Sequence, residues 1–231
     1  YYHTDPVGTI LPNVLGTYHL LELAREKKVA CLVFLSSGAV YGNVKGKLVS
    51  EDSGGWVDPL APGSCYAESK RMGETMCAAW QRQYRVPARM VRIRHTFGPT
   101  MDLERDERVF TSFVSSVLKG KDIVLRSDGS REIEFLYITD AVTGILRVIG
   151  SGKDGEAYNL SNSRERISVL ALARQLAESA KIDVRFTDVL VNDEKESQQT
   201  DTARLEALGW MPRISILEGF NRTINALRST K

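Results

Sequence analysis

Short apolar segments alternate with segments of helical periodicity, and this alternation constrains the fold of the chain more than any other feature. The run 29–35 reads Val-Ala-Cys-Leu-Val-Phe-Leu, which is typical of a strand that is buried on both faces of a parallel sheet. Strands that alternate with helices pack side by side in one mainly parallel sheet. The pattern therefore predicts an α/β fold.

Periodicity, capping residues and glycine or proline breaks predict the positions of the other elements. Further strands are predicted over 88–93, 123–125, 133–138 and 157–160, and helices over 5–27, 64–84, 108–118, 139–149, 168–180, 202–208 and 215–227. Asp5, Thr139-Asp140 and Ser168 are expected to be N-caps. The polar segment 36–63 contains several glycines and prolines and is expected to be a long surface loop.

The composition argues against several classes of protein. A length of 231 residues suits one globular unit, and a formal net charge of +2 argues against a nucleic-acid binder that relies on bulk charge. No two of Cys31, Cys65 and Cys77 have C-x-x-C spacing, so neither a disulfide framework nor a metal site is expected. No apolar run is long enough to cross a bilayer, and no signal peptide is visible. We therefore expect a soluble, cytoplasmic protein.

One pair of residues has the spacing of an acid–base pair. Tyr66 and Lys70 lie four residues apart near the start of the helix predicted over 64–84, so their side chains share one helix face. A tyrosine titrates near ~10, and a neighbouring ammonium favours the phenolate and lowers that pKa. Such a tyrosine can take a proton from a substrate hydroxyl. Because Tyr and Lys share this spacing by chance in many helices, the pair alone is weak evidence.

A short polar motif follows the first predicted strand. Residues 36–42 read Ser-Ser-Gly-Ala-Val-Tyr-Gly. Ligands of parallel sheets collect at the C-terminal ends of the strands, where a hydroxyl can hydrogen-bond a reacting oxygen. A tight turn with a capping serine is the structural alternative.

Together these motifs resemble the extended short-chain dehydrogenase/reductase family, in which Ser-Ser-x-x-Val-Tyr-Gly precedes Tyr-x-x-x-Lys. Four further segments resemble family motifs in the same order, namely Asn13–Thr17, Arg92–Pro99, Phe135–Asp140 and Leu208–Pro212. The resemblance implies an α/β fold with an incomplete Rossmann-type parallel sheet and a small C-terminal α/β substrate-binding lobe. It implies NAD as the cofactor, with NADP left open, and a nucleotide sugar as the substrate.

The resemblance also divides the chain. Residues 1–150 correspond to the C-terminal part of the NAD(P)-binding Rossmann domain, with part of 95–150 on the substrate side, and residues 151–231 correspond to the substrate-binding lobe. The family's Gly-x-x-Gly-x-x-Gly fingerprint is absent from the chain. We therefore expect on the order of 80 residues to precede Tyr1 in the full-length protein, and we expect the 231-residue chain alone to be inactive.

The resemblance assigns roles to several positions. Ser37 corresponds to the residue that hydrogen-bonds the hydroxyl being oxidised, Tyr66 to the general base, and Lys70 to the lysine that holds the nicotinamide ribose. Contacts with the cofactor are expected from Asn13, Ser37, Tyr66, Lys70 and Arg94. The substrate-binding positions are expected to be His95, Arg108, Val109, Arg131 and Asp201.

The resemblance further implies a homodimer. The helices expected over 5–27 and 64–84 correspond to the family's interface helices, which pair with their copies in a second subunit. Candidate interface residues, which could equally face the sheet, are Met72, Met76, Ala79 and Trp80.

The motif Ser37-Gly38-Ala39 departs from two subfamilies. The 4,6-dehydratases carry Thr-Asp-Glu at these positions, and uridine-diphosphoglucuronate decarboxylases carry Glu at the position of Ala39. Eliminating water needs a proton donor and a base, and Ala39 supplies neither. The motif resembles the 4-epimerases, which favours an epimerase. A decarboxylase, which the general texture of the sequence resembles most, or a dehydratase is the alternative.

Other departures concern the phosphate groups. His95 replaces a family asparagine, and Ile133 and Gln198 stand where arginines are usual. The loss of bidentate arginine contacts weakens recognition of a diphosphate. A non-catalytic nucleotide- or sugar-binding protein on the same fold is therefore a second class of function. The retained Ser37, Tyr66 and Lys70 oppose it, because a pure binding protein has no need of all three.

Overall fold

The computed structural model describes residues 3–44, 46, 48–106, 108–188 and 198–229, which form two compact units. The first unit comprises the described residues of Tyr1–Arg94, Ala141–Ser161 and Thr200–Met211. The second unit comprises those of His95–Asp140, Asn162–Gln199 and Pro212–Lys231. This division differs from a single boundary at residue 150, because the chain passes between the units several times.

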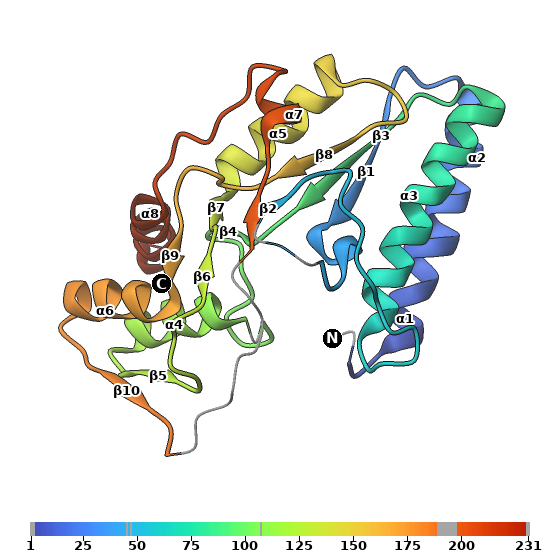
Figure 1. Cartoon of the computed structure of the whole chain (residues 1–231). Coiled ribbons are helices and arrows are strands. Elements are labelled where there is room, and N and C mark those ends of the chain that lie inside the picture. Colours follow the sequence, from blue (N-terminus) through green and yellow to red (C-terminus); the bar gives the residue numbers. More distant parts are fainter. Residues whose placement is uncertain (1–2, 45, 47, 107, 189–197, 230–231) are drawn as a thin grey trace. The chain divides into compact units, whose positions relative to one another are not determined.

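The first unit is built on a three-stranded parallel sheet, drawn in Figure 1. Its order is β1 (Leu32–Ser37), β3 (Ala88–Ile93) and β8 (Ala157–Leu160). This confirms the predicted parallel sheet. The sheet also explains why the first unit does not end at residue 150. Strand β8 lies beyond residue 150 in the sequence, yet it pairs with β3.

Strand β1 corrects one prediction. The sequence predicts a strand over 29–35 that is buried on both faces, whereas β1 begins at Leu32 and leaves Leu35 46% exposed. Within the described residues β1 pairs with β3 alone. An apolar composition indicates that a strand suits a buried environment, but it does not show which neighbours cover the strand.

Helix α3 (Ser64–Tyr84) has the predicted bounds and packs on β1 and β3. It approaches the sheet closely at Gly73, where an added Cβ would lie 2.3 Å from Cζ of Phe34. Beside it run α1 (Pro6–Leu11), a π-helical turn (Pro12–Gly16) and α2 (Thr17–Lys27). Asp5 caps α1, because its Oδ1 accepts a hydrogen bond from the backbone N–H of Gly8 at 2.9 Å. The predicted helix 5–27 is therefore confirmed over 6–27, except that Pro12–Gly16 has π-helical instead of α-helical hydrogen bonding.

The segment 36–63 contains two short elements instead of being an uninterrupted loop. A 3₁₀ turn, η2 (Gly38–Tyr41), follows β1 directly, and β2 (Leu48–Val49) follows later. The backbone N–H of Asp201 donates to the carbonyl of Val49 at 2.9 Å, which ties this segment to the residues before α7 (Ala203–Glu206).

The second unit packs around an aromatic core. Its helices are α4 (Val109–Lys119), α6 (Val169–Ala180) and α8 (Ile216–Ser229). The paired strands are β4 (Thr96–Phe97) with β7 (Leu136–Tyr137), β5 (Ile123–Leu125) with β10 (Val184–Phe186), and β6 (Glu132–Ile133) with β9 (Ile167–Ser168). The rings of Phe97 and Phe220 stack with centroids 4.2 Å apart, and Phe135 packs edge-on against both.

Two capping predictions have opposite outcomes. Ser168 caps α6 as expected, since its Oγ accepts from the N–H of Ala171. The predicted strand 133–138 is wrong as a single element, because β6 and β7 are separate and α5 (Ile138–Ser151) already begins at Ile138. Asp140 does not precede α5. Its carboxylate accepts from the N–H groups of Arg213 and Ile214, each at 2.8 Å.

The last described strand, β11, spans Gln199–Thr200. Among the described residues, no helix combines the length and the apolar content needed to cross a membrane.

Candidate functional site

The Tyr66–Lys70 pair of α3 lies at the end of β1 in the first unit. Nζ of Lys70 donates to the carbonyl of Leu35 at 2.9 Å. The same ammonium lies 6.0 Å from the centroid of the Tyr66 ring and 5.0 Å from that of Phe34. Burial lowers the pKa of Lys70, because desolvation disfavours its charged form. The structure thus places a half-buried cation beside the tyrosine proposed as the base.

Ser37 caps the 3₁₀ turn that follows β1. Its Oγ accepts a hydrogen bond from the N–H of Ala39 at 3.2 Å. A hydroxyl has one donor hydrogen and two lone pairs, so Ser37 can accept this bond and still donate to a reacting oxygen. The structural alternative, a capping serine, is therefore correct, and it is compatible with a chemical role.

Asn13 lies in the π-helical turn and connects it to α3. Its Nδ2 donates to the carbonyl of Thr9 at 3.0 Å and to Oγ of Ser69 at 3.1 Å. Oγ of Ser69 in turn donates to the carbonyl of Tyr66. The side chain of Asn13 thereby braces the turn of α3 that carries Tyr66 and Lys70.

Arg94 follows β3 and packs against Gly38. Its N–H donates to the carbonyl of Leu160 at 3.1 Å. A Cβ added to Gly38 would lie 2.8 Å from Cγ of Arg94 and 3.1 Å from its Cδ and Nε. A side chain at position 38 would therefore require Arg94 to move.

Asp201 has a structural role in the first unit. Its Oδ1 accepts from the N–H of Ala203 at 2.9 Å, and its carbonyl accepts from Nδ2 of Asn159. Its carboxylate thus binds the N–H of the first residue of α7.

Two predicted substrate residues of the second unit lie beside its aromatic core. The ring of His95 meets that of Phe135 edge-on at 6.2 Å, and His95 has a positive φ of 31°. Arg108 forms an ion pair with Asp106 at 2.6 Å, and its guanidinium lies 4.6 Å from the centroid of the Phe110 ring. Hydrogen bonding to Arg108 lowers the pKa of Asp106, so this pair stays charged.

The remaining two predicted residues also belong to the second unit. Val109 is the first residue of α4 and packs against the aromatic core. The carbonyl of Arg131 accepts from the N–H of Val169 at 3.0 Å. The structure therefore brings Asn13, Ser37, Tyr66, Lys70, Arg94 and Asp201 into one unit and His95, Arg108, Val109 and Arg131 into the other.

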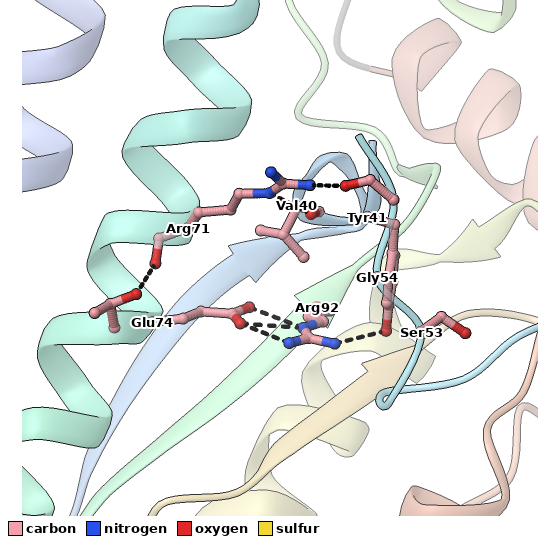
Figure 2. Close-up of a pocket in the computed structure, with 9 residues that line it drawn as sticks. Val40, Tyr41, Ser53, Gly54, Arg71, Glu74 and Arg92 are labelled. Atoms are coloured by element: carbon pink, nitrogen blue, oxygen red, sulfur yellow. Dashed lines mark hydrogen bonds and ion pairs between the residues drawn. The ribbon is translucent and has the colours of Figure 1, made fainter. Parts of the chain in front are cut away.

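Behind η2 the first unit has a pocket that the sequence analysis missed (Figure 2). Its volume is about 410 Å³. It is lined by Val40, Tyr41, Ser53, Gly54, Gly55, Arg71, Glu74, Thr75 and Arg92. Arg71 spans the pocket wall, because its Nε donates to the carbonyl of Val40 and its Nη2 to that of Gly55, each at 2.7 Å.

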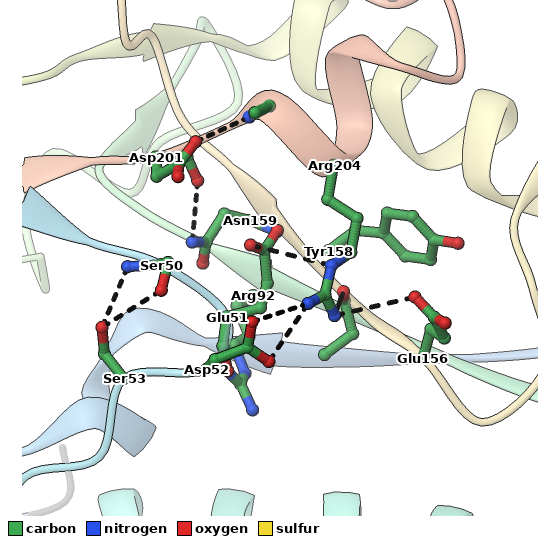
Figure 3. Close-up of polar contacts among 12 residues, drawn as sticks. Ser50, Glu51, Asp52, Ser53, Arg92, Glu156, Tyr158, Asn159, Asp201 and Arg204 are labelled. Atoms are coloured by element: carbon green, nitrogen blue, oxygen red, sulfur yellow. Dashed lines mark hydrogen bonds and ion pairs between the residues drawn. The ribbon is translucent and has the colours of Figure 1, made fainter.

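A second missed cluster surrounds Glu51 (Figure 3). Oε1 of Glu51 accepts from the N–H of Asn159 at 2.7 Å, and Arg204 lies between Glu51, Asp52 and Glu156. Burial raises the pKa of Glu51.

One sequence signal could have indicated the network around η2. Glu74 lies four residues after Lys70 and therefore on the same face of α3.

Comparison with known proteins gives a family match over most of the chain. The model of the NAD-dependent epimerase/dehydratase family matches residues 1–161. UDP-glucuronic acid decarboxylase 1 of Xenopus tropicalis is 33% identical over 230 residues, covering 98% of this chain and 53% of that protein. UDP-glucuronic acid decarboxylase 5 of Arabidopsis thaliana is 32% identical over 222 residues, covering 95% of this chain and 64% of that protein. The chain thus spans between half and two thirds of the length of these relatives.

Solved structures of similar fold include two epimerases. The UDP-glucose 4-epimerase of Thermotoga maritima, solved with UDP-glucose, has a TM-score of 0.87 at 25% identity. The match covers 99% of this chain and 73% of the epimerase chain. The UDP-glucuronic acid 4-epimerase of Bacillus cereus, solved with UDP-glucuronic acid and NAD, has a TM-score of 0.81 at 23% identity, with coverages of 96% and 69%. Both likenesses support a Rossmann-type fold.

Proposed function

The chain belongs to the NAD-dependent epimerase/dehydratase family, and we propose that the full-length protein oxidises a nucleotide sugar at C4 and acts as a 4-epimerase. The proposal is carried by one arrangement. The half-buried ammonium of Lys70 lies beside Tyr66 at the end of β1, and the adjoining turn supplies the Ser37 hydroxyl but no acidic side chain.

The residues present fit the cofactor that defines the family. One Lys70 proton is used by the carbonyl of Leu35, and an ammonium has three. Lys70 can therefore also donate to ribose hydroxyls. NAD, when bound, supplies the acceptor and later the donor of the hydride that leaves C4 and returns to it.

The proton steps need only the residues of the first unit. Tyr66 acts as the base that takes the proton of the C4 hydroxyl, while Ser37 donates a hydrogen bond to the same oxygen. In the reverse step Tyr66 returns the proton to the oxygen of the keto-sugar. When the sugar has turned over between the two steps, the product differs only in the configuration at C4.

The turn after β1 favours epimerisation over elimination. Ala39 and Gly38 offer no carboxyl group that could move a proton at C5 or C6 of the sugar. Gly38 cannot simply be exchanged for an acidic residue, since a Cβ there would lie 2.8 Å from Cγ of Arg94. The packing of Arg94 against this turn thus disfavours an acidic residue at position 38.

Decarboxylation is the second candidate, because the two relatives described above are UDP-glucuronic acid decarboxylases at 33% and 32% identity. Mass spectrometry separates the candidates. The full-length protein is incubated with NAD and UDP-glucose, UDP-glucuronic acid or UDP-N-acetylglucosamine, and the products are resolved chromatographically. We expect a new peak of unchanged mass. A loss of about 44 Da would identify a decarboxylase, and a loss of about 18 Da a dehydratase; either loss overturns the epimerase.

Tyr66→Phe tests whether the proposed base acts at all. Turnover should fall by roughly two to four orders of magnitude, the usual contribution of a general acid–base. Tyr84→Phe is the matched control, because Tyr84 lies on the same helix and is 40% exposed. If Tyr66→Phe and Tyr84→Phe both retain near-normal turnover, the proposed chemistry is wrong.

We also propose a homodimer through α1–α2 and α3. Leu11, Leu15, Tyr18 and Met72 are each between 41% and 50% exposed on these helices. Of the other candidate interface residues, Met76 and Trp80 pack partly against the core of the first unit. Light scattering of the full-length protein should show a dimer, and a monomer at micromolar concentration would contradict it.

The cytoplasmic location stays a prediction from cysteine usage.

A further inference from the structure

The residue before Ser37 is tied to the helix that carries Tyr66. Ser36 is 4% exposed, and its Oγ donates to Oε1 of Glu74 at 2.6 Å. Glu74 lies one turn beyond Lys70 on α3. The end of β1 is therefore hydrogen-bonded directly to the helix that holds the proposed base.

The same carboxylate forms a bidentate pair with Arg92 on β3. Nε and Nη2 of Arg92 donate to Glu74 at 2.9 and 2.7 Å, and both side chains are 13% exposed. Burial disfavours the charged guanidinium, but hydrogen bonding and charge attraction to Glu74 outweigh it and raise the pKa of Arg92. The sheet register places Arg92 beside Ser36.

The third nitrogen of Arg92 reaches the other end of the turn. Nη1 donates to the hydroxyl of Tyr41 at 3.0 Å and to the carbonyl of Glu51 at 2.8 Å. The hydroxyl of Tyr41, whose pKa burial raises, donates in turn to Oδ1 of Asn159 at 2.5 Å. Figure 2 shows Glu74 and Arg92 meeting below η2.

We propose that the Glu74–Arg92 pair positions the hydroxyl of Ser37 against Tyr66 for proton transfer. The pair holds the residue before Ser37 and the last residue of η2, and α3 carries both Glu74 and Tyr66, so one contact fixes the turn to the base. This inference rests on the proposed roles of Ser37 and Tyr66. Stability alone explains the pair poorly, because desolvation offsets most of the attraction in a buried ion pair.

Arg92→Lys tests the inference in the full-length protein, because lysine keeps the charge but cannot bind Glu74 bidentately and also reach Tyr41 and Glu51. We expect kcat to fall roughly ten- to hundredfold, as misplaced catalytic groups do, with KM changed less than about threefold. Arg89→Lys is the matched control. Arg89 lies on the same strand, is 14% exposed and pairs with Asp154, but at the opposite end of β3. Its kcat should stay within about twofold of the wild type.

A double-mutant cycle with Ser37→Ala separates positioning from general weakening of the fold. If Arg92 acts through Ser37, adding Arg92→Lys to Ser37→Ala should change kcat less than about twofold. If the two losses multiply, or if Arg92→Lys behaves as Arg89→Lys does, the inference is wrong.

Two further variants make the result interpretable if Arg92→Lys does not fold or if the proposed chemistry is wrong. Glu74→Gln should reproduce the loss in kcat, and it replaces Arg92→Lys in the cycle if that variant does not fold. Tyr66→Phe separates the two levels of the argument. Normal turnover of Tyr66→Phe overturns the proposed function, whereas an inactive Tyr66→Phe with unchanged Glu74→Gln overturns the positioning role alone.

Discussion

Each of the two units is stabilised internally by a different kind of contact. Around the turn after β1, the first unit relies on directional polar bonds, of which the Glu74–Arg92 pair and the Tyr41–Asn159 bond are the centre. The second unit relies on aromatic rings, of which Phe97, Phe135 and Phe220 are each 2% exposed or less. Aromatic burial stabilises a fold without demanding one orientation of each group, whereas a hydrogen bond fixes position within a few tenths of an ångström. The polar kind of contact lies where the proposed chemistry needs precise placement.

This difference predicts how each unit responds to substitution. In the second unit the cost of a change should follow the apolar volume that is lost. In the first unit the cost should follow the number of hydrogen bonds that are lost, even when almost no volume changes. All three tryptophans, Trp56, Trp80 and Trp210, belong to the first unit, so their fluorescence reports on that unit alone.

The largest expected effect is that of Phe220→Ala. The ring is fully buried and stacked on Phe97, so its removal should lower the free energy of unfolding of the second unit by about 3–5 kcal/mol. Urea unfolding, monitored by hydrogen exchange in peptides from 212–229, measures this loss of stability. Phe186→Ala is the control, because Phe186 belongs to the same unit and is 46% exposed. A loss in Phe220→Ala no larger than in the control would break the comparison.

An intermediate effect is expected when the same hydroxyl is removed from each unit. Tyr41→Phe leaves Oδ1 of Asn159 without its buried donor and removes one of the two acceptors of Nη1 of Arg92, which should cost about 1–3 kcal/mol. Tyr137→Phe removes a hydroxyl that makes no hydrogen bond to a described residue in the aromatic core, and it should cost less than about 0.5 kcal/mol. Urea unfolding of both variants measures the difference. Equal costs would show that polar direction matters no more in one unit than in the other.

The smallest expected effect concerns the charge of Glu51. Because burial raises its pKa above 4.5, the folded carboxyl keeps its proton at pH values where the unfolded chain has lost it. Stability from this group is therefore present below pH 4.5 and falls as the pH rises through the raised pKa. Glu51→Gln should match the wild type in acid and gain on the order of 1 kcal/mol or less at neutral pH. Urea unfolding across this pH range measures it, and a constant difference would contradict the prediction.

Much of the fold follows from local pattern. The helix 64–84 and the strands 88–93, 123–125 and 157–160 have the predicted bounds, because glycine, proline and periodicity mark them within a few residues of sequence. Prediction of element bounds fails where the pairing partners of a strand decide where it begins and ends. The segment 133–138 divides because its two halves pair with different strands, β9 and β4.

The candidate site shows the same limit. The spacing of Tyr66 and Lys70 predicts that they share a helix face, and their placement beside the end of β1 agrees with the motif that contains Ser37. The sequence did not indicate that Arg108 pairs with Asp106, nor that the carboxylate of Asp201 accepts from the first N–H of α7. A charged residue next to a motif can bind a ligand or pair with a nearby group of the protein, and the sequence does not distinguish the two.

The sequence by itself determined the α/β class, the parallel order of elements and the residue types available for proton transfer. Each of these depends on spacing along a helix or strand, which the chain encodes locally. Only the tertiary structure decided that Ser36, Glu74 and Arg92 meet, since they come from β1, α3 and β3 and lie far apart in the sequence. Their contact is set by strand register and by the close approach of α3 at Gly73, which depend on the packing of the whole unit.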